Sequence, residues 1–501
     1  MNRDLKLKMN TLIALVNQVI TILCGFILPR FYLKCYGSQV YGLASSISQF
    51  LGFVTLMELG MGAVVQSALY KPLAQKDKKE VSKIIKSATR FFNKVAIVFA
   101  AYTILLAFIY PTFIRKEFEF WFEASLILII SIGSLAEYFF GITYKLLLTA
   151  DQMAYIPLGL QSVGLIANFA ICVLLMQLGA PIHIVKLASS LVLLFRPVVQ
   201  IIYVNRKYDI DKTIRYSEEP IKQKWNGIAQ HIAYYVTNNT DTIVLSFLST
   251  LENVSIYSVY NMITNGIKQL VLTLNSGMQA LLGNLLAQCE YQELRIRFNK
   301  FEWEIHTIVT LLFSCVGVLI VPFVEVYTKG INDANYIQPL FALLMTLAQA
   351  SYCIRLPYNT MVCAAGHYKQ TQTSAIIEMI LNLLITVILV FNYGLIGVAI
   401  GTLVALVYRT IYLALYLSKN IIDYKITNFI KNVIVDIVEV ILISVITMFI
   451  PKVCINYLEW ALLACEVFSI SLMVILISNL LVYRKYTLSL LKGIFKRIVR
   501  N

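Results

Sequence analysis

The sequence predicts an all-α polytopic membrane protein of about 14 transmembrane helices, and its composition and apolar runs carry that prediction. Of its 501 residues, 59% are hydrophobic and only 14% are charged. Uncharged apolar runs of about twenty residues, long enough to cross a bilayer core as a helix, recur from end to end. The runs lack the alternation of barrel strands, and backbone groups in lipid must be hydrogen-bonded within the chain, so we expect helices.

The predicted spans follow one another closely. A tight Tyr36-Gly37-Ser38 link joins the first two, and the second breaks into a lysine-rich loop at Lys71-Pro72. The spans cover residues 10–34, 39–69, 91–113, 122–147, 153–178, 181–204, 227–249, 254–284, 302–325, 337–362, 371–391, 395–416, 430–450 and 458–482.

The net charge is +15, and most of the Lys and Arg residues are expected on one side of the membrane. With a cytoplasmic N-terminus, inner loops and tails carry about 31 Lys and Arg and outer loops about 7, which is the positive-inside pattern. We therefore expect both termini in the cytoplasm. The basic residues are interpreted as topology determinants beside anionic headgroups, and nucleic acid is not an expected partner.

An internal sequence duplication predicts that the chain folds into two lobes. Val40-Tyr41-Gly42 matches Ile256-Tyr257-Ser258, and Arg196 matches Arg409 at a similar depth. The matches keep one offset of about 213–217 residues, which predicts a parallel repeat of six spans. The predicted parts are an N-terminal lobe 1–205, a cytoplasmic linker 206–225, a C-terminal lobe 226–420, two appended helices in 421–482, and a basic amphipathic tail 483–501.

Catalytic and metal-binding motifs are missing from the sequence. It contains no Gly-x-x-x-x-Gly-Lys-Ser/Thr loop, His-Glu-x-x-His or Gly-x-Ser-x-Gly pattern. Its four histidines are scattered and its nine cysteines form no Cys-x-x-Cys pair. The sequence therefore predicts a transporter, not an enzyme, with no cofactor and no metal, and with H⁺ or Na⁺ coupling left open.

Several ionisable or amide side chains lie at membrane depth, where burying one charge costs about 2.5–3.5 kcal/mol or more. They should face a water-filled cavity or a partner. A basic lumen formed by Lys268, Arg355 and Arg409 would suit an anionic cargo, because a guanidinium fork matches phosphate oxygens. The predicted substrate-cavity residues are Arg30, Lys268, Arg355, Arg409, Arg196, Asn238 and Asn239, and those predicted for ion coupling or pairing are Glu58, Asp241 and Glu378.

Structural roles explain some of these residues equally well. Arg30 lies near a span end, where snorkelling accounts for its charge. Glu378 could be a structural partner of Arg355. Glu58 and Asp241 could pair with Lys268 or bind a coupling cation, and Glu439 is interpreted as a packing or pairing residue.

Two stretches resemble Wzx-type polysaccharide flippases (O-antigen, capsule or exopolysaccharide), of the polysaccharide transporter family in the MATE-like MOP exporter superfamily. One combines Pro29-Arg30 and Tyr36-Gly37 with the run from Glu58-Leu59-Gly60 to Lys71-Pro72. The other runs from Gly394 to Thr410. Asp241 and the segment around Tyr257 fit as well. Glu58 stands where the family pattern leads us to expect an aspartate, which leaves a shared acidic role open.

The resemblance implies two six-helix lobes forming a V around a central cavity. It also implies a bacterial cytoplasmic (inner) membrane protein that moves undecaprenyl-diphosphate-linked oligosaccharides from the inner to the outer leaflet by alternating access, for polysaccharide export. Membrane lipid, and the polymerase or export machinery of the polysaccharide, would be its partners. The alternatives are a cation-coupled multidrug exporter of the same superfamily and, less favoured, a membrane-embedded polymerase or glycosyltransferase.

Overall fold

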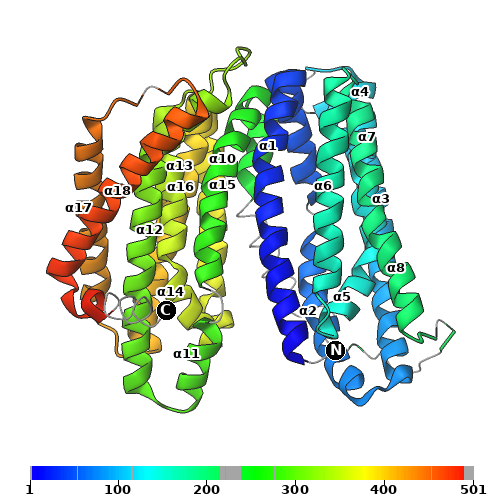
Figure 1. Ribbon diagram of the computed structural model, residues 1–501, viewed down its shortest axis with the longest axis horizontal. Coiled ribbons are helices and arrows are strands. Elements are labelled where there is room, and N and C mark those ends of the chain that lie inside the picture. The colour runs from blue at the N-terminus through cyan, green and yellow to red at the C-terminus, as the bar shows by residue number, and fades with distance from the viewer. Residues whose placement is uncertain are drawn as a thin grey trace. The chain divides into compact units, whose positions relative to one another are not determined.

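The computed structural model describes residues 3–52, 55–113, 117–211, 213–214, 221, 239–275, 278–452 and 454–489. Within these residues the chain forms helices joined by short links, and no strand occurs (Figure 1). Ten helices of this described part are long and apolar enough to cross a membrane. The all-α polytopic fold is therefore confirmed.

Most helices fall on predicted spans, whereas residues 227–238 of the predicted span 227–249 lie outside the described residues. In the first part of the chain the helices are α1 (Arg3–Gly52), α2 (Thr55–Gln75), α3 (Lys78–Phe113), α4 (Phe120–Ala136), η1 (Glu137–Gly141), α5 (Ile142–Ala150), α6 (Tyr155–Gln177), α7 (Ile182–Leu193) and α8 (Phe195–Lys207). In the second they are α10 (Leu251–Leu274), α11 (Met278–Ala287), α12 (Tyr291–Tyr327), α13 (Pro339–Ile354), α14 (Leu356–Ala364), α15 (Tyr368–Tyr393), α16 (Leu395–Asn420), α17 (Ile426–Met448) and α18 (Tyr457–Val482).

The ten candidate spans are fewer than the about 14 predicted ones, in part because neighbouring pieces join. The helix α1 contains a break at Gly37, whose φ of 80° and ψ of 175° lie in a region almost restricted to glycine. The predicted Tyr36-Gly37-Ser38 link is thus a kink between two helical pieces. The helix α17 carries Lys431, Asp436 and Glu439, more charge than a purely apolar span would hold.

Prolines interrupt two other predicted spans. Pro197 has no N–H for the carbonyl four residues earlier, and the chain breaks there between α7 and α8. Pro357 does the same between α13 and α14. Each break lies beside a basic residue, Arg196 in the first case and Arg355 in the second, so the kinks present these arginines at membrane depth.

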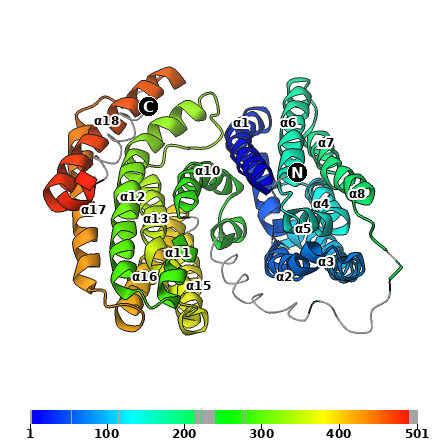
Figure 2. The same cartoon turned by 60° about the horizontal axis from the view of Figure 1, so that its bottom comes forward.

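The contacts divide the chain into two compact units, Met1–Ser255 and Ile256–Asn501. In the first, α1 packs along α6, and α2 lies against α3 and α5 (Figure 2). In the second, α15 packs against α16, and α13 packs against both α16 and α12. Each unit has its own buried apolar core. The predicted lobe and linker bounds stay predictions.

The helices α15 and α16 approach each other unusually closely. A Cβ added to Gly397 would lie 2.5 Å from the Leu389 carbonyl oxygen, and one added to Gly401 would collide with the Thr386 hydroxyl. Small residues permit such an approach in membrane helices. Close contact between these two helices brings the acidic side chain of α15 to the basic side chain of α16.

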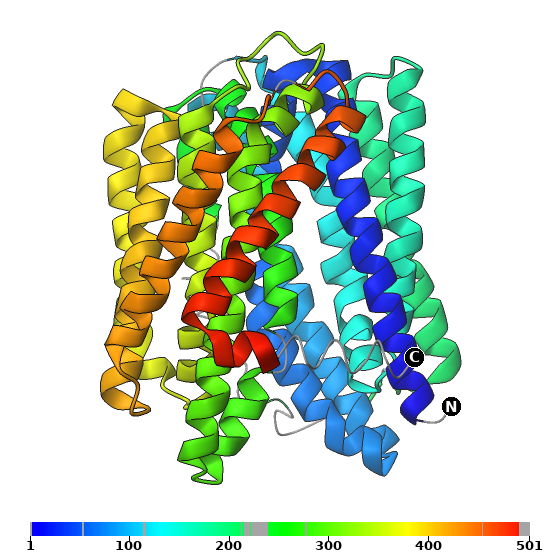
Figure 3. The same ribbon diagram turned by 60° about the vertical axis from the view of Figure 1, so that its left-hand side comes forward.

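The helix α17 has a buried polar face and an exposed apolar face. It buries Asn432, Asp436 and Glu439, and exposes Ile434 and Ile441. It packs against α12 and α18. Figure 3 shows α17 in orange and α18 in red. Because lipid is the apolar medium around such a helix, its ionisable groups are directed toward neighbouring helices.

Candidate functional site

A buried basic cluster in the second unit consists of Lys268 from α10, Arg355 from the α13–α14 break, Glu378 from α15 and Arg409 from α16, with the Tyr352 ring beside them. Arg355 Nη1 lies 2.6 Å from Glu378 Oε1, and Arg409 Nε lies 3.8 Å from Glu378 Oε2. The sequence thus predicted three basic residues that the fold brings to one place.

The remaining contacts hold the cluster in shape. Arg409 Nη1 donates hydrogen bonds to the Thr371 carbonyl at 3.1 Å and the Ser374 hydroxyl at 2.6 Å. Lys268 Nζ lies 3.9 Å from the centre of the Tyr352 ring, and the Arg355 guanidinium carbon lies 4.4 Å from it. Cation–π contacts of this kind offset part of the free-energy cost of desolvating a cation.

The formal charges of the cluster do not cancel. Lys268, Arg355 and Arg409 carry three positive charges and Glu378 one negative charge. Lys268, Glu378 and Arg409 are each at least 91% buried. Within these four side chains the cations outnumber the carboxylate three to one, so the cluster would stabilise an anion at membrane depth.

The other predicted cavity residues are not part of this cluster. Arg196 forms a two-pronged ion pair with Glu137 in the first unit, with Nη2 at 2.7 Å from Oε1 and Nε at 3.3 Å from Oε2. Arg30 is half-buried on α1, and Asn239 and Asp241 lie on a helical stretch that is described from residue 239 to residue 248. Asn238 and the side chain of Glu58 lie outside the described residues.

A second polar cluster, here called the acidic network, was missed by the sequence analysis except for Glu439. It contains Glu302 and His306 of α12 and Asp436 and Glu439 of α17, all at least 92% buried. His306 Nδ1 lies 2.6 Å from Asp436 Oδ2, and the Thr310 hydroxyl donates to Asp436 Oδ1 at 3.0 Å.

Helical spacing could have revealed this network. Glu302 and His306 are four residues apart, and so are Asn432 and Asp436, with Glu439 three residues further on. Such spacings place the side chains on one face of a helix. A polar face on an otherwise apolar span indicates a polar partner helix, but the sequence does not say which helix that is.

Several solved structures of transporters are similar to this chain in fold. The lipid II flippase MurJ, in an inward closed conformation, superposes with a TM-score of 0.71 at 15% identity, covering 95% of this chain and 98% of that one. An inward-facing multidrug resistance MATE family transporter of the MOP superfamily gives 0.58 at 14%, covering 83% and 98%. The Vibrio cholerae MATE transporter VcmN, in the bent form, gives 0.55 at 12%, covering 83% and 97%.

The chain has the MurJ/MATE-like fold. No protein-family model and no curated protein sequence matches it. At these identities the likeness shows the fold alone. The MurJ structure matches nearly the whole of this chain. The two MATE structures are also matched over nearly their whole length, but they leave about a sixth of this chain unmatched. A MurJ/MATE-like fold thus accounts for the helical arrangement, and the chemistry has to be argued from this chain's own residues.

Proposed function

We propose that this protein is a flippase that moves an undecaprenyl-diphosphate-linked oligosaccharide from the inner to the outer leaflet of the bacterial cytoplasmic membrane by alternating access. The observation that carries the proposal is the gathering of three cationic side chains around a single carboxylate in the basic cluster. A diphosphate carries negative charge through the membrane, and that charge needs compensation wherever lipid surrounds the transport path.

The two guanidinium groups of the cluster suit a diphosphate, which carries oxygens on two phosphorus atoms. Each guanidinium has five N–H donors, and the hydrogen bonds described engage Nη1 of Arg355 and Nη1 of Arg409. Charge-assisted bonds from two planar forks can bind phosphate oxygens on neighbouring phosphorus atoms. Lys268 would add a point charge. The lipid tail would remain in the bilayer, and the polymerase or export machinery would act on the product.

Ligand binding by the full chain in nanodiscs tests this function. The ligand is an undecaprenyl-diphosphate oligosaccharide, titrated against wild type and a Lys268→Gln/Arg355→Gln/Glu378→Gln/Arg409→Gln variant. Replacing Glu378 as well avoids an uncompensated buried carboxylate, which would destabilise the fold. The matched control is Lys369→Gln/Lys419→Gln/Lys425→Gln, which removes three exposed charges from the same region.

We expect wild type to bind the lipid-linked oligosaccharide saturably. The affinity should fall at least tenfold in the cluster variant and stay unchanged in the control. Equal binding by wild type and the cluster variant would contradict the proposal. A lipophilic cationic drug serves as competitor, and saturable drug binding with no affinity for the lipid-linked sugar would favour the multidrug exporter instead.

A further inference from the structure

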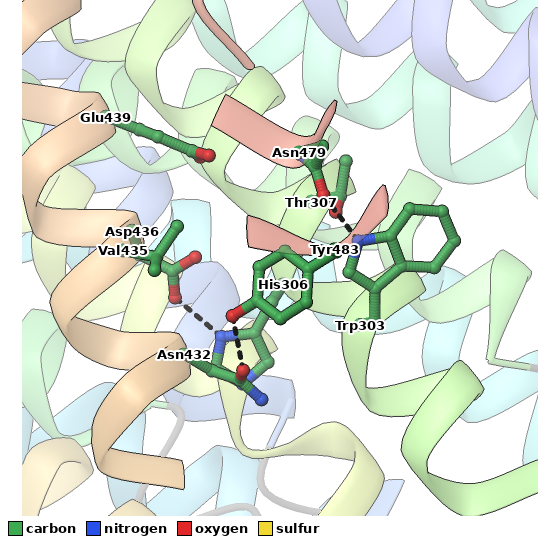
Figure 4. Close-up of a pocket in the computed structure, with 9 residues that line it drawn as sticks. All are labelled: Trp303, His306, Thr307, Asn432, Val435, Asp436, Glu439, Asn479 and Tyr483. Carbon is green, nitrogen blue, oxygen red and sulfur yellow. Dashed lines mark hydrogen bonds and ion pairs between the residues drawn. The ribbon is translucent and has the colours of Figure 1, made fainter. Parts of the chain in front are cut away.

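A small polar cavity lies inside the acidic network, between α12, α17 and α18. It measures about 10 Å³, which is room for about one water molecule. Figure 4 shows Asn432, Asp436 and Glu439 extending from α17 toward the side chains of Trp303, His306 and Asn479. The cavity lies within the second unit and shares no residue with the basic cluster.

Hydrogen bonds link this cavity to the loop between α16 and α17. The Tyr424 hydroxyl, in that loop, donates to Glu302 Oε1, and the Tyr358 hydroxyl donates to the same oxygen at 2.6 Å. Tyr358 also lies 3.2 Å from His306 Nε2, and His306 contacts Asp436. A continuous series of titratable groups therefore runs from a loop at the helix ends to the cavity.

With Glu302 and Asp436 both ionised, the hydrogen bonds of this series place a proton on each ring nitrogen of His306. Tyr358 has one hydroxyl proton and gives it to Glu302, so its oxygen must accept from His306 Nε2. The Thr310 hydroxyl donates to Asp436 Oδ1, and an ionised Asp436 accepts from His306 Nδ1 on Oδ2. Both ring nitrogens carry a proton, and His306 is an imidazolium cation between two carboxylates.

An ionised Glu439 would have no further positive charge opposite it in the acidic network. Glu302, His306 and Asp436 together carry a net charge of −1, and an ionised Glu439 would raise the buried charge to −2. Glu439 is 98% buried, and its Oε1 has no hydrogen-bond partner among the described residues, although the Ser478 hydroxyl interacts with the carboxyl. Burying a second unpaired negative charge is costly, so neutralisation by a cation is favoured.

The oxygens around the cavity favour a proton over a metal ion. Asn479 Oδ1 accepts from Trp303 Nε1 at 2.5 Å, Asn432 Oδ1 accepts from the Tyr483 hydroxyl at 2.5 Å, and both Asp436 oxygens are engaged. Hard metal cations need several oxygen ligands at once, and Glu439 Oε1 alone is not enough. The described part of the chain contains no group of three or more His, Cys, Asp and Glu side chains that could hold a metal ion.

We propose that Glu439 binds a proton that enters from the aqueous phase through Tyr424, Glu302, Tyr358, His306 and Asp436 and crosses the cavity on one water molecule. One O–H bond forms at the Glu439 carboxylate as one breaks at the donor, with no electron transfer. The helix α12 has 37 residues, about 55 Å at 1.5 Å per residue, so it projects beyond a bilayer core of about 30 Å and places Glu302 near the aqueous edge.

The groups that face His306 are Glu302 of its own helix, Tyr358 of α14, and Asp436 and Glu439 of α17, with Tyr424 and Tyr483 in the flanking segments. None of these side chains is basic. The proton site is independent of the proposed flippase function, since it can be measured on the protein without substrate.

Infrared difference spectroscopy of the full chain in nanodiscs, between acidic and alkaline buffers, tests this proposal. Wild type should show a carbonyl stretch from the buried protonated carboxyl of Glu439 that titrates. Glu439→Gln, a neutral isostere, should lose that signal, whereas Glu466→Gln, on an exposed position of α18, should keep it. Glu439→Asp should shift the band without abolishing it. A wild type without the band, or a band that survives in Glu439→Gln, would overturn the proposal.

Two further arms test the ligand and the route. Replacing N-methylglucamine chloride by sodium chloride at equal ionic strength should leave the band unchanged, and its displacement by sodium would show a metal-ion site instead. Tyr358→Phe should keep the band but slow its hydrogen–deuterium exchange several-fold, whereas Tyr412→Phe should not. Unchanged exchange in Tyr358→Phe would rule out the route through His306.

Discussion

Glu378 joins two guanidinium groups, with its carboxylate oxygens 2.6 Å from Arg355 Nη1 and 3.8 Å from Arg409 Nε. This one side chain of α15 therefore holds together residues from the α13–α14 break and from α16. Without it, three positive charges would be buried near one another with no opposite charge among them. The stability of the second unit should depend on it.

Glu378→Gln should therefore lower the free energy of unfolding by about 3–5 kcal/mol, the usual cost of leaving a buried charge without its partner. Equilibrium unfolding in mixed micelles measures it. Glu304→Gln, which breaks a partly exposed pair with Lys300 on α12, should change stability by about 1 kcal/mol or less. Equal losses in both variants would mean that Glu378 is not needed to hold the cluster.

His306 and Asp436 should be energetically coupled. In a double-mutant cycle, His306→Gln and Asp436→Asn together should be less damaging than the sum of the single effects, because each single change leaves a buried partner unpaired. We expect a coupling of about 0.5–3 kcal/mol in thermal or chemical unfolding. His306→Gln combined with the exposed Glu466→Gln should be additive. Additivity in both cycles would exclude an ion pair between His306 and Asp436.

Gly37 should tolerate no side chain, since its backbone lies at φ 80° and ψ 175°. Gly37→Ala should cost about 1–3 kcal/mol of unfolding free energy by straining the kink. Gly25→Ala lies in the same helix, where a Cβ would meet nothing within 4 Å, and should be neutral or slightly stabilising. Thermal unfolding of the two variants tests the kink, and a stable Gly37→Ala protein would argue against it.

Gly397→Ala should separate α15 from α16, because the new Cβ would lie 2.5 Å from the Leu389 carbonyl oxygen. Overpacking of this kind costs about 1–3 kcal/mol. The matched variant is Gly164→Ala on α6, where a Cβ meets nothing within 4 Å and no loss is expected. In addition, Gly397→Ala should weaken the ligand binding of the basic cluster, which spans the same helix pair. Stability that is identical in the two variants would contradict the close approach.

Local features of the chain were predictable. Helical spans follow from the length of apolar runs, and the kink at Gly37 and the breaks beside Pro197 and Pro357 follow from backbone properties of single residues. The candidate site was predictable in part. Charge at membrane depth singled out Lys268, Arg355 and Arg409, because such charges are costly wherever they lie in a span. Asn432 and Asp436, by contrast, were not singled out, and only their helical spacing could have revealed them.

The sequence by itself determined that this is a polytopic helical membrane protein with basic residues at membrane depth, because hydrophobic length and charge are properties of each segment. The tertiary structure alone decided which charges meet. It paired His306 with Asp436 across 130 residues, and it gathered Arg355 and Arg409 around Glu378. The physical reason is that a polar helix face requires a partner in lipid, while its identity depends on how whole helices pack.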